Sequence, residues 1–236
     1  MRKVFLDCGA HMGSSIKLFF DIFPDAQDYE IYSFEANPNF YSCFEPNHLE
    51  YGALFWADTK LDFSKFTFIP KAVWVEDTKI TFFKRAKHDS ESSTLIKKKV
   101  EFQNNRRWKE VEVDAIDFAA WIKDKLTPED YIVLKMDIEG AEYEVLEKMY
   151  QQGVFKYINE FYCELHNVKC GRGRDDDRKI IERLNEYGLT AYLWDANLKN
   201  NVGFKETVYD LEWVDDKNKL YPRHEASREW YEKEDL

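Results

Sequence analysis

Short apolar runs that end in an acidic residue alternate along this chain with segments of helical apolar spacing. The first run, Val4–Leu6, ends at Asp7, passes through a turn with two glycines and enters Ile16–Phe23, where apolar residues recur at helical intervals. Two further runs end at Glu35 and at Asp137. This alternation of strands and helices predicts an α/β domain with a mostly parallel sheet. In such sheets, ligands bind at the carboxyl ends of the strands.

The rest of the pattern extends this sheet and adds a hairpin beside it. We expect strands at Phe66–Ile69, Glu110–Asp114, Tyr157–Leu165, Thr190–Trp194 and Glu206–Val214, a β-rich hairpin segment at Lys79–Lys84, a loop at His88–Thr94, and helices at Ala115–Lys125 and Asp175–Tyr187. The last two strands are expected to form the antiparallel closing pair of the sheet. We therefore expect one domain over residues 1–214, followed by a charged helix or tail over residues 215–236.

Composition narrows the classes of function. The 236 residues suffice for one domain with a substantial core, and a net charge of −11 argues against general nucleic-acid binding. Basic residues gather in three places and are expected to be solvated faces, with recognition of an anionic substrate as the alternative: Lys97–Lys99, Arg106 and Arg107 with Lys109, and Arg172, Arg174 and Arg178. No apolar run is long enough to span a bilayer or to serve as a signal peptide, so we expect a cytoplasmic protein.

The acids that end the first two strands indicate a nucleoside cofactor. A carboxylate at Asp7 would repel a dinucleotide pyrophosphate and attract the ammonium group of S-adenosylmethionine. Gly9 and Gly13 let the turn bend tightly and let a ligand approach its backbone. Glu35 ends the second strand of the βαβ unit, where an acid accepts hydrogen bonds from ribose hydroxyls, and a solvated strand-end residue is the alternative.

A third acidic strand end lies near the middle of the expected sheet. The strand Tyr131–Met136 is almost entirely apolar, as in strands buried on both faces of a parallel sheet. It is followed by Asp137 and Glu139, which flank Ile138, and then by a helix with one apolar face. Carboxylates at this position lie in the crevice where open α/β sheets bind their ligands.

Three segments in this order, Asp7–Gly13, Phe34–Pro38 and Lys135–Leu146, closely resemble the motifs of FkbM-type methyltransferases, and the likeness runs from Val4 to His166. The resemblance implies a Rossmann-like class I methyltransferase fold, with a mostly parallel seven-stranded sheet, an antiparallel closing strand and helices on both faces. It also implies methyl transfer from S-adenosylmethionine to an oxygen. Many members of the family are associated with glycans, so the acceptor expected is a sugar hydroxyl, for example one of rhamnose, on a glycan or a glycosylated small molecule.

The resemblance also implies which residues contact S-adenosylmethionine. The residues expected at the cofactor are Asp7, Gly9, Ala10, His11, Gly13, Ser14, Glu35, Ala36, Asn37, Ala72, Val73, Ser93 and Asp137. Ala72 and Val73 are expected beside the adenine ring. For His11, the expected role is contact with the cofactor or shaping of the turn.

Transfer to a hydroxyl also needs a group that removes a proton. Asp137, Glu139 and His166 are the candidates, and His166 has the unperturbed pKa closest to neutrality. Capping of a strand end is the alternative role for this histidine. Together with Glu164, these residues could instead hold a divalent metal. We do not favour a metal, because one of the four groups is an imidazole and Mg²⁺ prefers oxygen ligands.

Two other classes of function compete with O-methyl transfer. An NAD-dependent oxidoreductase could use the same architecture, but Asp7 and the lack of a Tyr-x-x-x-Lys pair placed for hydride chemistry count against it. A non-catalytic module that binds S-adenosylmethionine could retain the pocket, but intact acids at Asp137 and Glu139 argue against decay of the site. Stabilisation by S-adenosylmethionine, S-adenosylhomocysteine or NAD would separate the three, because a bound ligand stabilises the folded state.

Overall fold

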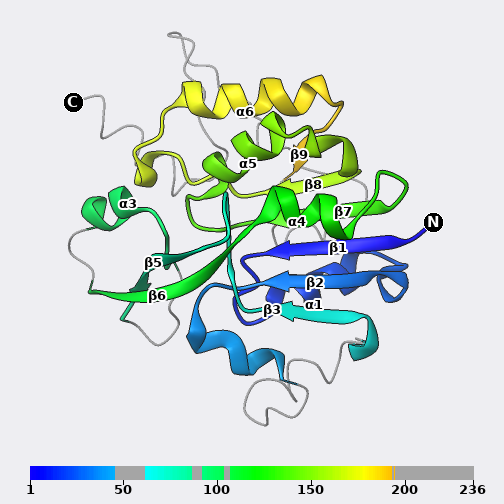
Figure 1. Cartoon of the computed structure of the whole chain (residues 1–236), viewed down its shortest axis with the longest axis horizontal. Helices are drawn as coiled ribbons and strands as arrows, with labels where there is room; N and C mark the ends of the chain where they lie inside the picture. Colours follow the sequence, from blue (N-terminus) through cyan, green and yellow to red (C-terminus); the bar gives the residue numbers. More distant parts are fainter. Residues whose placement is uncertain (46–61, 87–91, 104–106, 193, 195–236) are drawn as a thin grey trace.

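The structure, a computed structural model, describes residues 1–45, 62–86, 92–103, 107–192 and 194. Its largest element is a sheet of six parallel strands in the order β3-β2-β1-β7-β8-β9 (Figure 1). These strands are β1 (Lys3–Cys8), β2 (Glu30–Phe34), β3 (Phe66–Ile69), β7 (Tyr131–Met136), β8 (Glu160–Cys163) and β9 (Ala191–Tyr192). Because all six are parallel, their carboxyl ends meet at one edge of the sheet, on the left of Figure 1.

Helices cover both faces of this sheet. Helix α1 (Ser14–Ile22) packs on one face, where Phe5 of β1 stacks on Phe19 with ring centroids 4.0 Å apart. The helices on the other face are α4 (Phe118–Lys125), α5 (Glu142–Gln151) and α6 (Arg174–Glu186). Val4 and Leu6 join the core under these helices, since neighbours along a strand point to opposite faces. Among the described residues, every helix is too short or too polar to cross a membrane.

A second, three-stranded sheet lies at the carboxyl ends of the main strands, together with helix α3 (Lys97–Phe102) (Figure 1). Its strands, in the order β4-β6-β5, are β4 (Ala72–Trp74), β5 (Thr78–Arg85) and β6 (Trp108–Asp117). Short 3₁₀ helices occupy Ala26–Asp28, Pro38–Phe44, Phe63–Lys65, Val154–Tyr157 and Val168–Cys170. The small sheet and α3 therefore stand beside the edge at which a ligand site is expected.

The structure confirms the predicted fold class, an α/β domain with a mostly parallel sheet and helices on both faces. It also confirms the strand at Phe66–Ile69 and the hairpin segment Lys79–Lys84, which pairs antiparallel with β6. Strand β9 joins β8 in parallel. The expected closing strand, Glu206–Val214, the segment 215–236 and the first part of the predicted loop His88–Thr94 lie outside the described residues.

Several predicted boundaries are wrong. The strand expected at Glu110–Asp114 extends over Trp108–Asp117, and in the region of Thr190–Trp194 the described strand is Ala191–Tyr192. The helix expected at Ala115–Lys125 begins only at Phe118, because Ala115 and the two residues after it pair with β4. The strand expected at Tyr157–Leu165 is confined to the four residues of β8, because a 3₁₀ helix extends to Tyr157. At the start of α4, pairing with another strand overrides the local helical preference, whereas at β8 a local 3₁₀ helix replaces the start of the expected strand.

Gly9, directly after β1, lies against the end of β7. It adopts a φ of 80°, and a Cβ atom at this position would lie 1.8 Å from the carbonyl oxygen of Asp137. Its backbone N–H donates to the carbonyl oxygen of Phe34 at 3.0 Å, while the N–H of Asp137 donates to the carbonyl oxygen of Cys8 at 3.1 Å. No side chain fits between these strands, so glycine lets the turn close onto both neighbours of β1.

Replacing Gly9 tests this close approach. We expect Gly9→Ala to lower the free energy of unfolding by at least about 2 kcal/mol, because the new methyl group meets backbone and the positive φ is strained for alanine. Gly173→Ala is the matched control, since nothing lies within 4 Å of a Cβ atom there, and its cost should stay below about 1 kcal/mol. Urea unfolding of both variants measures the difference, and equal stabilities would contradict the account.

Candidate active site

A cavity of about 580 Å³ opens at the carboxyl ends of β1, β2 and β7, which is the size range of small-molecule sites. Its lining includes many of the residues predicted from the sequence: Gly9, His11, Ser14, Glu35, Ala36, Asn37, Ala72, Val73, Ser93, Asp137 and Glu139. The other predicted residues, Asp7, Ala10, Gly13 and His166, lie outside the lining. The structure thus brings three separate strand ends and the second sheet together around one cavity.

Glu35 links the turn after β1 to the end of β2. One carboxylate oxygen accepts the backbone N–H of His11 at 2.7 Å, and the other accepts the N–H of Asn37 at 2.6 Å. Burial raises the pKa of Glu35, while these two N–H groups limit the rise. Each oxygen keeps a further lone pair, so Glu35 can also accept hydrogen bonds from a ligand in the cavity.

Asp7 is fully buried, and its contacts are internal. Its Oδ2 accepts hydrogen bonds from the hydroxyls of Ser15 at 2.7 Å and Ser33 at 3.3 Å. Its Oδ1 lies 3.5 Å from Nζ of Lys135. The structure therefore places a protein ammonium beside this carboxylate, and contact of Asp7 with a cofactor stays a prediction.

Lys135, which the sequence analysis did not single out, lies between the ends of β1 and β7 and lines the cavity. Its Nζ donates to the carbonyl oxygens of Gly9 at 2.8 Å and Cys8 at 3.3 Å. It also lies 3.9 Å from Oδ2 of Asp137. Burial lowers the pKa of this ammonium, but Asp7 and Asp137 outweigh burial and raise the pKa. The signal in the sequence is one charged residue inside an otherwise apolar buried strand.

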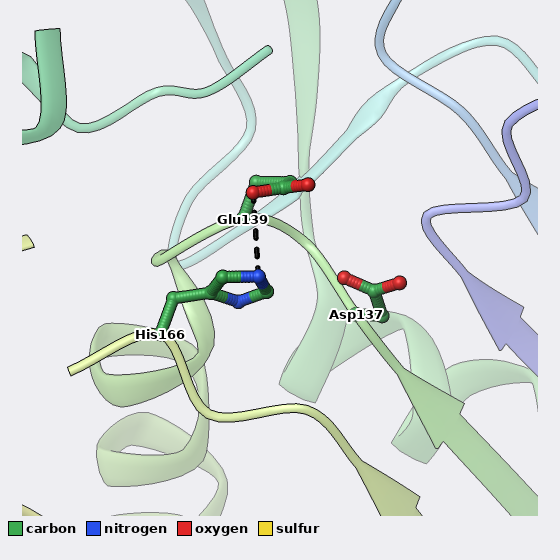
Figure 2. Close-up of side chains that lie close together, drawn as sticks. All are labelled: Asp137, Glu139 and His166. Atoms are coloured by element: carbon green, nitrogen blue, oxygen red, sulfur yellow. Dashed lines mark ion pairs between the residues drawn. The ribbon is translucent and has the colours of Figure 1, made fainter. Parts of the chain in front are cut away.

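Asp137, Glu139 and His166 form a cluster beside the cavity. One side-chain ligand atom from each lies within 4.8 Å of the others. Figure 2 shows the His166 imidazole facing the Glu139 carboxylate, with Asp137 next to them on the segment that follows β7. Nε2 of His166 lies 3.3 Å from Oε2 of Glu139 and 3.6 Å from Oε1 of Glu164. The three predicted catalytic residues therefore do meet.

Glu142, a second residue that the sequence analysis missed, contacts both backbone and side-chain groups at this cluster through its carboxylate. It is fully buried, and its carboxylate accepts the backbone N–H groups of Ile138 and Gly140, both at 2.8 Å. Its Oε1 also lies 3.1 Å from Nδ1 of His166. One carboxylate thus fixes the segment 137–140, which we call the acidic loop, and it anchors the imidazole of His166 so that Nε2 faces Glu139. The signal in the sequence that could have pointed to Glu142 is its position in the first turn of α5, because helix N-termini favour acidic residues.

Glu139 adopts a φ of 59°, which is uncommon for a residue other than glycine. Its carbonyl oxygen accepts a hydrogen bond from the Thr94 hydroxyl at 2.7 Å, and its carboxylate pairs with Lys99. Lys99 belongs to a stretch that we expected to be solvated, and for this residue the prediction is wrong. The short helix α3 turns its third lysine inward, whereas Lys97 and Lys98 are exposed.

The neighbouring acids differ in their affinity for protons. Burial raises the pKa of Asp137 to about 6, although Lys135 and His166 oppose the shift. Burial also acts on Glu139, but His166 and Lys99 outweigh it and hold the pKa of Glu139 below its usual range. Burial lowers the pKa of His166, but Glu142 and Glu139 more than offset this and raise it to about 9. The site therefore contains a charged Glu139 paired with cations, beside an Asp137 able to exchange a proton near neutrality.

The methyltransferase FkbM domain model matches residues 7–189 of this chain. The chain belongs to the FkbM methyltransferase family. The matched residues include the strand ends that surround the cavity, so the resemblance of the three sequence motifs is confirmed.

A solved structure, the crystal structure of Methyltransferase FkbM from Methylobacillus flagellatus KT, is similar to this FkbM chain at 17% sequence identity with a TM-score of 0.37. The similar region covers 64% of this chain and 30% of that protein. This FkbM chain therefore spans less than a third of that protein's length. No curated protein matches the chain.

The electrostatics of His166 can be tested directly. We expect NMR titration of its imidazole to give a pKa of about 9. Because this pKa exceeds the unfolded value of 6.5, protonated His166 should stabilise the fold below pH 6.5, and this contribution should disappear as the pH rises through 9. Glu142→Gln should lower the pKa of His166, whereas Glu147→Gln, further along α5, should leave it unchanged. An ordinary pKa in the wild type would contradict the geometry.

Proposed function

We propose that this domain is an S-adenosylmethionine-dependent O-methyltransferase, and that its acceptor is a sugar hydroxyl on a glycan or a glycosylated small molecule. One observation carries the proposal. A single cavity is lined both by the Gly9 turn with Glu35, the expected cofactor residues, and by Asp137 with Glu139, the expected catalytic acids. A methyl donor and a hydroxyl acceptor that share this space would meet at the acidic loop, and such positioning provides much of the rate of a bimolecular transfer.

The chain fits the cofactor in two respects. The side-chain amide nitrogen of Asn37 is buried at the cavity and has no hydrogen-bond partner in the part of the chain that the structure describes. Such a donor is costly to leave unsatisfied, so a ligand acceptor at this position is favourable. Ala72 and Val73 supply apolar lining suited to an adenine ring, and Glu35 offers acceptors suited to ribose hydroxyls.

When bound, S-adenosylmethionine supplies a sulfonium-activated methyl group, whose transfer to the acceptor oxygen breaks the carbon–sulfur bond and releases the hydroxyl proton. In our proposal Asp137 accepts this proton on a carboxylate oxygen. It lines the cavity, about a third of its side chain is exposed, and burial raises its pKa to about 6. These properties suit a general base that works near neutrality.

His166 has a different part in this proposal. Its raised pKa keeps the imidazole protonated at neutral pH, and a protonated imidazole cannot accept a further proton. It lies against Glu139 and is anchored by Glu142. We therefore assign it the role of positioning Glu139, and we assign Glu139 to binding of acceptor hydroxyls. A charged carboxylate accepts strong hydrogen bonds from hydroxyls, which supports a sugar as acceptor.

Substitution of Glu35 tests the proposed cofactor site. Titration calorimetry should show that the wild type binds S-adenosylmethionine and S-adenosylhomocysteine but not NAD. Glu35→Gln should weaken this binding by roughly 10–100-fold, because ribose hydroxyls lose a charged acceptor. Glu110→Gln, exposed on β6, is the control and should bind like the wild type. Binding of NAD alone would instead support the oxidoreductase alternative.

Activity tests the proposed base. With methyl-labelled S-adenosylmethionine and a panel of sugars, Asp137→Asn should lower methyl transfer roughly 10²–10⁴-fold. In the wild type, kcat/KM should fall as the pH drops below 6, since a protonated Asp137 cannot act as a base. Asp114→Asn, exposed on β6, should remain fully active. Cofactor binding without transfer to any hydroxyl would support the alternative of a non-catalytic module.

A further inference from the structure

Lys99 lies inside the protein, although the two lysines before it are exposed. Its side chain is only 1% exposed, and Nζ contacts Oε2 of Glu139. Nζ also lies 3.4 Å from the carbonyl oxygen of the same residue. Burial of an ammonium is unfavourable unless a carboxylate compensates for the lost water. Here that carboxylate belongs to one of the acids at the candidate active site.

The fold enforces this contact. The Thr94 hydroxyl donates to the carbonyl oxygen of Glu139 at 2.7 Å and accepts the backbone N–H of Ile96 at 2.9 Å, which ties the start of α3 to the acidic loop. On the other side, a Cβ atom at Gly140 would lie 2.2 Å from Sγ of Cys170 and 3.2 Å from Cγ1 of Ile96. Glycine at this position lets both segments pack against the loop. The Lys99 ammonium that contacts Glu139 therefore belongs to a helix that is packed closely against the acidic loop.

The three clustered residues of the candidate active site, Asp137, Glu139 and His166, have the spacing of a metal site. The ligand atoms of Asp137, Glu139 and His166 lie within 4.8 Å of one another, and two carboxylates with one imidazole suit divalent transition metals. However, Oε2 of Glu139 is already in contact with Lys99 and lies 3.3 Å from Nε2 of His166. A divalent ion in this cluster would have to displace the ammonium from Glu139 or share the space with it against charge repulsion.

We propose that the Lys99 ammonium occupies the place of a divalent cation in this cluster, as a positioning residue that holds the Glu139 carboxylate. The cluster thereby has its own fixed positive charge. The position of the ammonium is independent of the reaction, whereas its role in methyl transfer rests on the proposed function.

Removal of the ammonium should turn the cluster into a metal site. Lys99→Met keeps an unbranched apolar side chain and deletes the charge, and Lys98→Met is the matched control on the exposed side of the same helix. Binding of Mn²⁺ is followed by electron paramagnetic resonance. We expect Lys99→Met to bind Mn²⁺ at least about tenfold more tightly than the wild type or Lys98→Met, because the repulsion from the Lys99 ammonium is gone and only the proton of His166 remains to be displaced. Adding Asp137→Asn to Lys99→Met should abolish the gain.

Two results would overturn the proposal. One is a folded Lys99→Met protein that gains no affinity for Mn²⁺. The other is a wild type that already binds Mn²⁺ as tightly as Lys99→Met and loses this binding on Asp137→Asn. The wild-type measurement decides the matter even if Lys99→Met fails to fold, because strong binding that depends on Asp137 contradicts the proposal and its absence supports it. No methyl transfer is measured, so failure of the proposed function would leave this result unchanged.

Discussion

The buried ammonium of Lys135 ties together the carboxyl ends of β1 and β7, and the candidate site is built around that junction. It donates to the carbonyl oxygen of Gly9, and it lies close to the carboxylates of Asp7 and Asp137. Without it, Asp7 would be a fully buried charge supported only by two serine hydroxyls, and removal of one partner of a buried ion pair costs about 3–5 kcal/mol. Gly9 permits the two strands to approach closely, so this one ammonium contacts both the turn after β1 and Asp137, the first acid of the acidic loop.

Glu142 has the corresponding role on the far side of the acidic loop. Its carboxylate accepts two backbone N–H groups of the loop and contacts the imidazole of His166. Glu139 is then held by three groups that come from different parts of the chain, namely His166, Lys99 and Thr94. Neighbouring carboxylates thus acquire different proton affinities, which is the usual arrangement where one acid exchanges protons and another binds or positions.

Much of the fold and part of the site could be predicted from the sequence, because the relevant signals are local. Apolar runs that end in acids mark β1, β2 and β7, and parallel strands bring their ends to one edge, so Glu35, Asp137 and Glu139 were expected at a common cavity. The start of α4 could not be predicted in this way, because Ala115 and the two residues after it pair with β4.

The roles of the two buried lysines depend on contacts between segments far apart in the chain. Lys135 donates to a carbonyl 126 residues away, and Lys99 pairs with an acid 40 residues away. In the sequence, Lys99 looks like its two exposed neighbours, and only the packing of α3 against the acidic loop distinguishes it. Charge pairing across tertiary contacts therefore explains most of what sequence patterns missed.

A crystal structure of the protein with S-adenosylhomocysteine tests the central claim most directly, that one cavity serves both the cofactor and the acidic loop. The account predicts ribose hydroxyls on the carboxylate of Glu35, an adenine ring beside Ala72 and Val73, and the sulfur end directed toward Asp137 and Glu139. S-adenosylhomocysteine bound outside this cavity, or bound in it with its sulfur turned away from the acidic loop, would contradict the account.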